Sequence, residues 1–291
     1  MNRLWSTCVQ GVGTLYQSRS LRFSDDFKEA YLRALGIEDG ATVLEIGCGP
    51  GALMQSLARW YPRSALRGID RDENFIRFAR EKVPSAQFDV GDATRLPYEE
   101  GSFDVTLSHT VMEHVEPSGF LREQHRVLRQ GGACLVLSVR RVIDVQAPVM
   151  EDASPLEDAI WKKVEARYKA FSREAGVGAY PVDERELPLL MERHGFSDVS
   201  TRYVAISLTP DDPGCSRETA CAIFEDRRQM ALESADALLA IAPEAVTAEE
   251  IEALKQERSA RCDRRRALYN RGEKQWDTYT VLMGIFRGVK A

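Results

Sequence analysis

The sequence predicts a single α/β domain built on a Rossmann-like, doubly wound sheet, and two observations lead to that prediction. Between residues 41 and 139, short apolar runs alternate with amphipathic helical segments, which is the pattern of parallel strands joined by crossover helices. The first apolar run ends in a glycine-rich turn that leads directly into a helical segment. The 291 residues, 44% of them hydrophobic, suffice for the core of one large domain.

The elements follow from these runs in chain order. Strands are expected at 42–46, 65–70, 86–90, 103–107 and 133–139, with helices at 53–60, 74–82 and 118–128. After residue 139 the alternation is lost. A helix is expected at 187–194, where Gly195 ends it, followed by a sixth strand at 200–208 and a seventh at 278–286.

Three helical pieces have no place in a minimal sheet of this kind. They are an N-terminal arm at 1–38, an insert at 144–178, and a second insert at 211–275 between strands six and seven. Thr247 and Glu250 have the spacing of a capping box at the start of a helix. We expect these pieces to form a lid over the carboxyl edge of the cofactor-binding half, residues 40–143. Covering apolar surface, or building a homodimer contact, is the alternative role.

Composition excludes several classes of protein. A formal net charge of −6 argues against a general nucleic-acid binder, which normally carries an excess of Lys and Arg. The six cysteines are scattered without a Cys-x-x-Cys pair, as expected for free thiols in a reducing compartment. The most apolar run, 133–139, is too short to span a bilayer, and no secretory leader is recognised. A cytoplasmic location without membrane attachment is therefore expected.

The glycine turn predicts close approach of the backbone to a nucleotide-like ligand. Gly47, Gly49 and Gly51 tolerate positive φ angles and lack the Cβ atoms that would block a tight turn. Together with Ala52, the first two also satisfy a dinucleotide fingerprint, and Asp70 lies where an acid accepts hydrogen bonds from ribose hydroxyls. These features alone fit an NAD(P)-dependent oxidoreductase as well as other adenosine ligands.

Further features separate these two interpretations. Glu45 lies inside the first strand, where it can shape the glycine turn, and Asp92 follows the third strand, where it can accept from an adenine amino group. Five motifs follow one another in the order VLEIGCGPG, GID, GDATRLP, SFDVTLSHTVMEHV and RVLRQGG. Together they resemble the class I S-adenosylmethionine-dependent methyltransferases, and in particular their small-molecule "type 11" branch, which includes ubiquinone and menaquinone methylases.

The resemblance covers residues 41–139 and extends to the helix and strand at 187–208, but not to the arm or the inserts. It implies a seven-stranded sheet of order 3-2-1-4-5-7-6 with the last strand antiparallel. It also implies S-adenosyl-L-methionine as methyl donor, S-adenosyl-L-homocysteine as product, and a small-molecule acceptor. A protein that binds this cofactor without catalysis is a further alternative.

Cofactor-binding residues are carried over from the resemblance position by position. Residues of the first strand and the glycine turn surround the methionine part of the cofactor: Glu45, Gly47, Cys48, Gly49 and Gly51. Residues after the second and third strands hold its adenosine: Asp70 at the ribose hydroxyls, Arg71 beside the adenine, Asp92 at the adenine amino group and Ala93 against the ring. Cys48 is interpreted as a small turn residue rather than as a nucleophile.

His109, after the fourth strand, is the candidate for the junction between cofactor and acceptor. Ligands of such sheets bind at the carboxyl ends of the strands, so His109 is either a catalytic base or a residue whose backbone holds the cofactor. Some family members bind a divalent ion through Glu-x-x-Glu-His near this point. Here Thr110 stands in the first position before Glu113 and His114, so no metal site is predicted.

Two observations bear on the acceptor. Residues 255–274 contain eight basic side chains against three acidic ones, which could attract an anionic substrate or RNA, although the acidic whole disfavours RNA. The nucleobase-methylating pattern Asn/Asp-Pro-Pro-aromatic is absent after strand four, so DNA is not expected as a partner. In the N-terminal arm, Tyr16, Arg19 and Arg22 are candidates for closing over the cofactor.

Overall fold

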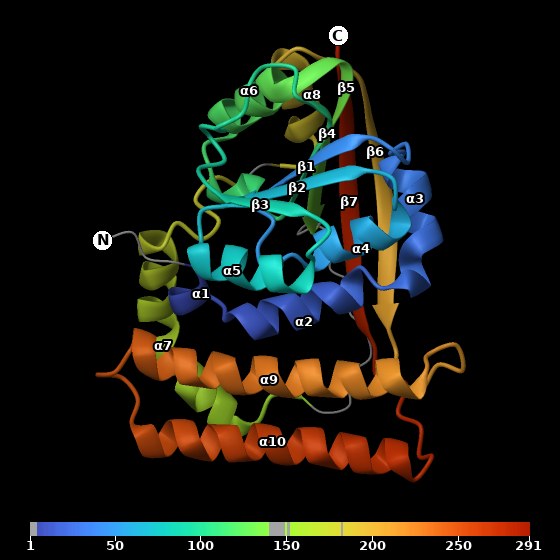
Figure 1. The fold of residues 1–291 in the computed structure, drawn as a ribbon. Coiled ribbons are helices and arrows are strands. Elements are labelled where there is room, and N and C mark those ends of the chain that lie inside the picture. Colours follow the sequence, from blue (N-terminus) through green and yellow to red (C-terminus); the bar gives the residue numbers. More distant parts are fainter. Residues whose placement is uncertain (1–4, 140–148, 150–151, 182) are drawn as a thin grey trace.

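The computed structural model describes residues 5–139, 149, 152–181 and 183–291. Within these ranges the strands form one seven-stranded sheet of order β3-β2-β1-β4-β5-β7-β6 (Figure 1). Strands β1 to β5 are parallel, whereas β7 is antiparallel to both of its neighbours. The predicted fold class and strand order are confirmed. Residues 1–4 of the expected arm, and the boundary expected at 143–144, lie outside the described residues.

The strand positions match the expected runs, but two strands begin earlier than expected. The strands are β1 Thr42–Ile46, β2 Ala65–Asp70, β3 Gln87–Val90, β4 Phe103–His109, β5 Leu128–Val139, β6 Phe196–Leu208 and β7 Tyr279–Lys290. Strand β5 includes Gly131 and Gly132, although two consecutive glycines are more typical of a turn. They are accommodated because the register between β4 and β5 shifts between Phe103 and Val105, and Gly131 adopts a φ of +76°.

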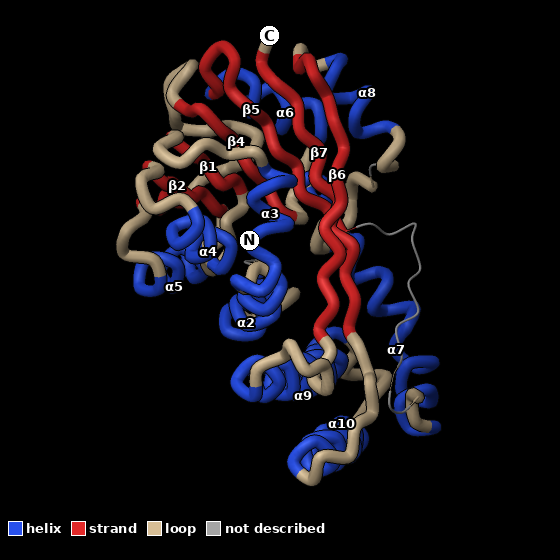
Figure 2. Tube along the Cα trace, turned by 90° about the vertical axis from the view of Figure 1, so that its right-hand side faces the viewer, coloured by secondary structure: helices blue, strands red, loops and turns tan. Residues whose placement is uncertain are grey.

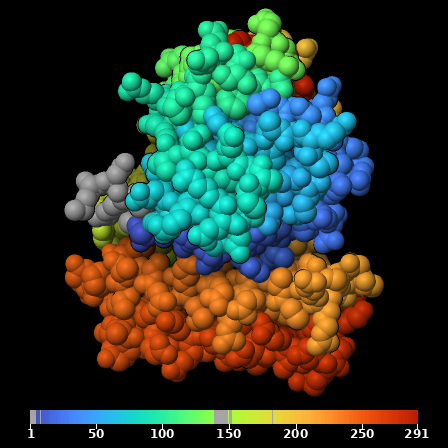
Figure 3. Space-filling model, in the orientation of Figure 1, coloured from blue at the N-terminus to red at the C-terminus, as the bar shows by residue number. Residues whose placement is uncertain are grey.

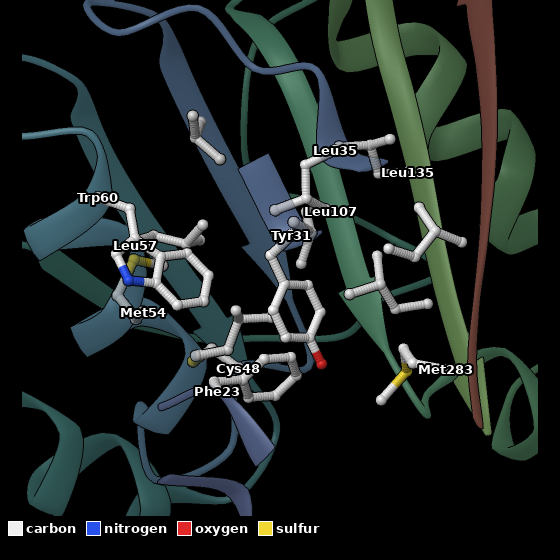
Figure 4. Close-up of a cluster of buried hydrophobic side chains, with 14 of the residues drawn as sticks. Phe23, Tyr31, Leu35, Cys48, Met54, Leu57, Trp60, Leu107, Leu135 and Met283 are labelled. Atoms are coloured by element: carbon white, nitrogen blue, oxygen red, sulfur yellow. The ribbon is translucent and has the colours of Figure 1, made fainter. Parts of the chain in front are cut away.

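The two faces of the sheet are covered by different helices. On one face, α3 (Lys28–Leu35), α4 (Ala52–Trp60) and α5 (Glu73–Lys82) contribute side chains to a large buried cluster. Figure 4 shows Tyr31, Leu57 and Trp60 of this cluster packed towards Leu107 of β4. On the other face, α6 (Pro117–Val127) and α8 (Glu186–Arg193) contribute to a second cluster. The core is therefore that of a doubly wound fold, with helices on both faces.

The inserted helices form a third layer with an apolar core of their own. Helices α7 (Pro155–Glu174), α9 (Arg217–Ile241) and α10 (Ala248–Asn270) share buried side chains of Ile160, Val164, Ala235, Leu238, Ala242, Val246, Ile251 and Leu254. Figures 1 and 2 show α9 and α10 side by side beneath the sheet, at the ends of the long strands β6 and β7. In Figure 3 they form a continuous slab across the bottom of the molecule.

The N-terminal arm lies between this slab and the sheet domain. Its described part up to residue 27 contains α1 (Trp5–Cys8), α2 (Val12–Arg22) and the short 3-10 helix η1 (Asp25–Phe27), whereas α3, also within the arm expected at 1–38, packs on the sheet. Helix α2 contacts α4 on one side and α9 on the other (Figure 2). Among the described residues, no helix is long and apolar enough to cross a membrane.

A buried ion-pair group ties α10 to the sheet domain. Arg265 of α10 donates to Asp211, which follows β6, at 2.7 Å, and to Asp277, which precedes β7, at 2.7 Å. All three side chains are buried, so loss of one would leave an uncompensated buried charge. The position of the slab under the sheet therefore depends on this group.

Leu57 tests the packing of α4 against the sheet. Its side chain is fully buried in the cluster on the α4 face. We expect Leu57→Ala to lower the free energy of unfolding by about 2–5 kcal/mol, because it removes apolar contacts and leaves a cavity. Leu189→Ala in α8 is the control. Because Leu189 is 54% exposed, this substitution should change the free energy of unfolding little. Urea denaturation of both variants measures the difference, and equal effects would contradict this account of the core.

Candidate active site

The loop that follows β1 requires glycine at two positions. Gly47, Gly49 and Gly51 have φ angles of +69°, +53° and +85°, in the region that L-residues with a side chain rarely adopt. A Cβ atom on Gly47 would lie 2.3 Å from Cγ2 of Val111, which follows β4. A Cβ atom on Gly51 would lie 3.0 Å from that of Ala79 in α5. The loop is therefore packed between two neighbouring segments through glycine backbone alone.

Asp70, at the end of β2, holds this loop in place. Its Oδ2 accepts a hydrogen bond from the Gly49 amide at 2.9 Å, and its Oδ1 accepts from the Asp72 amide at 2.9 Å. The amides of Gly47 and Cys48 donate to the carbonyl of Ile69 in the same strand. A carboxylate has about four acceptor positions, so two remain on Asp70 for a ligand. Burial raises the pKa of Asp70 above its usual value.

Glu45 lies directly beneath the loop and is buried within β1. Its Oε2 atom is shielded from water and has no hydrogen-bond partner among the described residues. Burial, followed by the nearby charge of Asp70, raises the pKa of Glu45 well above its usual value. A buried polar atom without a partner costs free energy, so this position suits a cationic or hydrogen-bond-donating ligand group.

The thiol of Cys48 is also buried within the loop. Burial is the main reason that its pKa is raised well above its usual value. A thiol in this state is a poor nucleophile because little thiolate forms. The structure therefore supports the interpretation of Cys48 as a small packing residue.

The residues expected at the adenosine end lie at the same edge of the sheet. Asp70 is in register with Val90 of β3, two residues before Asp92. Asp92 is exposed, and its Oδ1 accepts from the amide and hydroxyl of Thr94, both at 2.8 Å. Ala93 is half-buried against the cluster on the α6 face, and Arg71 is exposed. The β2 and β3 ends thus bring the two acids to one rim.

His109 ends β4 and is buried next to the N-terminal arm. Its ring packs edge-on against Phe23, with the centroids 4.9 Å apart, and Nε2 has no hydrogen-bond partner among the described residues. Burial, followed by the charges of Arg19 and Arg22, lowers the pKa of His109 well below its usual value. The imidazole is therefore neutral near pH 7. Thr110 follows with a φ of +53°, a strained backbone of the kind that clusters at functional sites.

Two polar residues near Arg22, namely Asp226 and Tyr279, were not identified from the sequence. Nη2 of Arg22 donates to the hydroxyl of Tyr279, in β7, at 2.7 Å. Asp226 of α9 is buried, and burial raises its pKa to about 6. Arg22, Asp226 and Tyr279 line a cavity of about 230 Å³. They come from the arm, the second insert and the last strand, so no local sequence pattern could have joined them.

The arm residues named from the sequence separate in the structure. Arg19 is buried, and burial lowers its pKa to about 9, with Arg22 adding to the effect. Tyr16 instead contacts α4 and α5, where its hydroxyl donates to Gln55 of α4 at 2.8 Å and its ring contacts Phe78 of α5. The arm also reaches the end of β2, because the amide of Ser6 donates to Asp72 at 2.7 Å.

Glu113 and His114 lie in the short 3-10 helix η2 (Met112–His114). Nδ1 of His114 accepts from the amide of Gly178 at 2.9 Å, and its ring lies 4.7 Å from that of Trp5. The backbone carbonyl of Glu113 accepts from the Tyr180 amide. Among the described residues, no group of three or more His, Cys, Asp or Glu side chains is placed to hold a metal ion.

Part of the sequence is similar to known methyltransferases. Residues 44–136 match the family described as "Methyltransferase domain". The demethylmenaquinone methyltransferase of Roseiflexus castenholzii is 26% identical over 232 residues, which cover 75% of this chain and 93% of that protein. The fatty-acid O-methyltransferase of Mycolicibacterium smegmatis is 35% identical over 111 residues, 37% of this chain and 40% of that protein.

A solved structure shares the fold over nearly the whole chain. Phosphoethanolamine N-methyltransferase 2 of Haemonchus contortus, in complex with S-adenosyl-L-methionine, superposes with a TM-score of 0.54. The match has 15% identity and covers 98% of this chain and 59% of that one. The fold of the chain thus agrees with the sequence matches. Over residues 44–136 the chain is therefore similar to class I S-adenosylmethionine-dependent methyltransferases of the type 11 branch.

Proposed function

We propose that the protein transfers a methyl group from S-adenosyl-L-methionine to a small-molecule acceptor. The observation that carries the proposal is the buried, unpartnered Oε2 of Glu45 under a glycine loop that Asp70 holds. The methionine part of S-adenosyl-L-methionine carries an ammonium group that can donate a hydrogen bond to Oε2 of Glu45. Its ribose carries hydroxyls that can donate to Asp70. The methyltransferase relatives named above act on a quinone precursor and on fatty acids, which supports a small-molecule acceptor.

The cofactor roles are assigned along the edge of the sheet. Glu45 and the backbone of the glycine loop, including Cys48, hold the methionine part. The two remaining acceptor positions of Asp70 take the ribose hydroxyls. Asp92 accepts from the adenine amino group, with Ala93 against the ring and Arg71 beside it. The half-buried position of Ala93, against the apolar cluster under α6, supports its contact with a flat ring.

S-adenosyl-L-methionine supplies an electrophilic methyl group: a lone pair of the acceptor forms the new bond to carbon, while the sulfur–carbon pair stays on sulfur as S-adenosyl-L-homocysteine. The main task of the protein is to hold the acceptor in line with the methyl group. His109 is placed to do this at the end of β4. Its neutral ring can accept a hydrogen bond through Nε2 without placing positive charge next to a sulfonium.

An acceptor that carries a proton needs a base, and Asp226 suits that role better than His109. The strongly lowered pKa of His109 makes its ring a weak base. The pKa of Asp226 is about 6, so this carboxylate is ionised at pH 7 and still basic enough to take a proton. Its Oδ1 has no hydrogen-bond partner among the described residues, and Asp226 lines the small cavity together with Arg22.

The arm and the second insert, on this proposal, close the acceptor side of the site. Helix α2 contacts both α4 and α9, so it links the cofactor loop to the insert. A homodimer contact through the inserts is the alternative role, and gel filtration of the full chain distinguishes the two. We also propose a cytoplasmic enzyme without a nucleic-acid partner, which the net charge of −6 and the buried free thiols of Cys48 and Cys134 support.

Asp70→Ala tests the cofactor assignment. We expect the variant to bind S-adenosyl-L-methionine about 10- to 150-fold more weakly, because charge-assisted hydrogen bonds of about 1.5–3 kcal/mol are lost. Isothermal titration calorimetry measures the affinity. Asp89→Ala is the matched control, because Asp89 on β3 pairs with Tyr98 and Arg67 rather than with the loop. Unchanged affinity in Asp70→Ala would refute the ribose assignment, and binding of NAD alone by the wild-type protein would refute the proposed function.

Asp226→Asn tests the ionisation of the carboxyl that we propose as base. Because its pKa rises from 3.8 to about 6 on folding, the folded protein holds this proton more tightly, and stability falls as the pH rises from about 4 to about 6. Above that range the asparagine variant should therefore gain up to about 3 kcal/mol relative to wild type, and the gain should shrink towards pH 4.

Urea denaturation at about pH 4.5 and about pH 7.5 measures this difference. Asp236→Asn, also on α9, is the control, because Asp236 is exposed and bonds Lys255. A gain of equal size at both pH values would show that Asp226 does not titrate in this range.

A further inference from the structure

A second, larger cavity lies inside the slab of inserted helices and adjoins the small cavity beside Arg22. Its volume is about 530 Å³, and residues of α7, α9, α10 and the start of β7 line it. The two cavities share Arg227, Met230 and Tyr279 as lining residues. The two cavities are therefore neighbours, and Arg22 of the small one is near enough to His109 for its charge to help lower the pKa of that residue. A volume of this size is typical of small-molecule sites.

The surface that lines the larger cavity is mainly apolar, although eight of its fourteen lining residues are polar or charged. Phe224, Met230 and Ala231 of α9 face it from one helix. Met230 is 39% exposed although it is large and apolar, so part of this wall is open to water. When a ligand displaces the water from apolar surface that is enclosed between helices in this way, the free energy falls and binding is favoured.

The charges around the same cavity are predominantly positive. Four guanidinium groups line it, those of Arg227, Arg258, Arg261 and Arg265, against the carboxylates of Glu157 and Asp277. Each carboxylate is shared by two of the arginines. The arginines of the lining outnumber its carboxylates by two, and by one when Asp211, which Arg265 also bonds, is counted, although the whole chain has a net charge of −6. Burial acts to raise the pKa of Glu157, but the hydrogen bonds from Arg261, the Ser154 amide and Arg258 together outweigh it and lower the pKa to about 2, so this carboxylate stays ionised.

One of these guanidinium groups has unused hydrogen-bonding capacity. Arg265 is buried, and its Nη1 has no hydrogen-bond partner among the described residues. Its other nitrogens bond Asp211 and Asp277. A buried donor of this kind is stabilised by an acceptor, and most of all by an anionic one. The excess charge and the free Nη1 therefore point to the same ligand chemistry.

We infer that these adjoining cavities bind the methyl acceptor, and that the acceptor is a molecule with an apolar body and a single anionic group at its outer end. The anion contacts the arginines of α10, and the apolar body lies along Phe224, Met230 and Ala231. The end that receives the methyl group lies in the small cavity, between Arg22 and Asp226. This inference rests on the proposed function, and it assigns the second insert as the part that selects the acceptor.

Three alkyl probes of equal chain length test the charge preference: decanoate, 1-decanol and decyltrimethylammonium. We expect the full chain to bind decanoate at least about tenfold more tightly than decanol, and the cation least well. We also expect decanoate to bind equally well in the presence of saturating S-adenosyl-L-homocysteine, because an acceptor must occupy the site together with the cofactor. Calorimetry measures each affinity. Equal binding of the three probes, preference for the cation, or competition with S-adenosyl-L-homocysteine would overturn the inference.

Two pairs of variants locate the probe. Arg258→Gln should weaken decanoate about tenfold and leave decanol unchanged, because it removes one charge while Arg261 still holds Glu157. Lys255→Gln is the control: it also removes one positive charge from α10, but Lys255 pairs with Asp236 away from the cavity. It should change the affinity for neither probe. Ala231→Trp should weaken both probes by filling the space, whereas Ala240→Trp, on an exposed position of α9, should not. If Arg258→Gln and Ala231→Trp behave like their controls, the inference is wrong.

The inference and the proposed function fail separately. S-adenosyl-L-methionine affinity is measured for the wild type and all four variants, none of which alters the residues that we assign to the cofactor. If the wild type does not bind S-adenosyl-L-methionine, the proposed function is wrong whatever the probes do. If it binds S-adenosyl-L-methionine and shows no preference for decanoate, the acceptor inference alone is wrong.

Discussion

The site depends on one steric constraint, the absence of side chains at Gly47 and Gly51 in the loop after β1. With any Cβ on Gly47, the loop would collide with Val111, and the end of β1 could not lie against the segment that follows β4. Because the loop is pure backbone there, its amides are available to Ile69 and Asp70 of β2. The ends of β1, β2 and β4 thus lie together at one edge of the sheet, and the cofactor assignments depend on this arrangement.

Burial determines the electrostatics of the site more than specific charge pairs do. It is the largest cause of the raised pKa values of Glu45, Asp70 and Asp226 and of the lowered pKa of His109. Groups whose charged forms are disfavoured in this way are stabilised when a ligand supplies the opposite charge or a hydrogen bond. A cationic donor near Glu45 is therefore a natural partner. The neutral His109 is compatible with that donor because it does not repel a positive charge.

The inserted helices give the domain a second region with a different chemical character. Their apolar core is separate from both clusters of the sheet, and the buried Arg265 group fixes them to the ends of β6 and β7. The arm helix α2 fills the space between the two regions and contributes Arg19 and Arg22. The division suggests how such a chain changes its acceptor without changing its donor: the glycine loop is constrained by packing, while the inserts carry few contacts to it.

The sequence by itself predicted the fold class from its alternating apolar runs, and the strand order and methyl donor from the resemblance of five ordered motifs to a known family. The glycines are also encoded locally, because the positive φ angles at Gly47, Gly49 and Gly51 can be met cheaply only by glycine. Only the tertiary structure brought Asp226 and Tyr279 to Arg22, because they lie in three segments more than 50 residues apart in the chain. It also decided that the basic residues of α10 face a cavity as well as solvent. Helical periodicity fixes which residues share a face but not what that face meets, and that depends on how α9, α10 and α2 pack together.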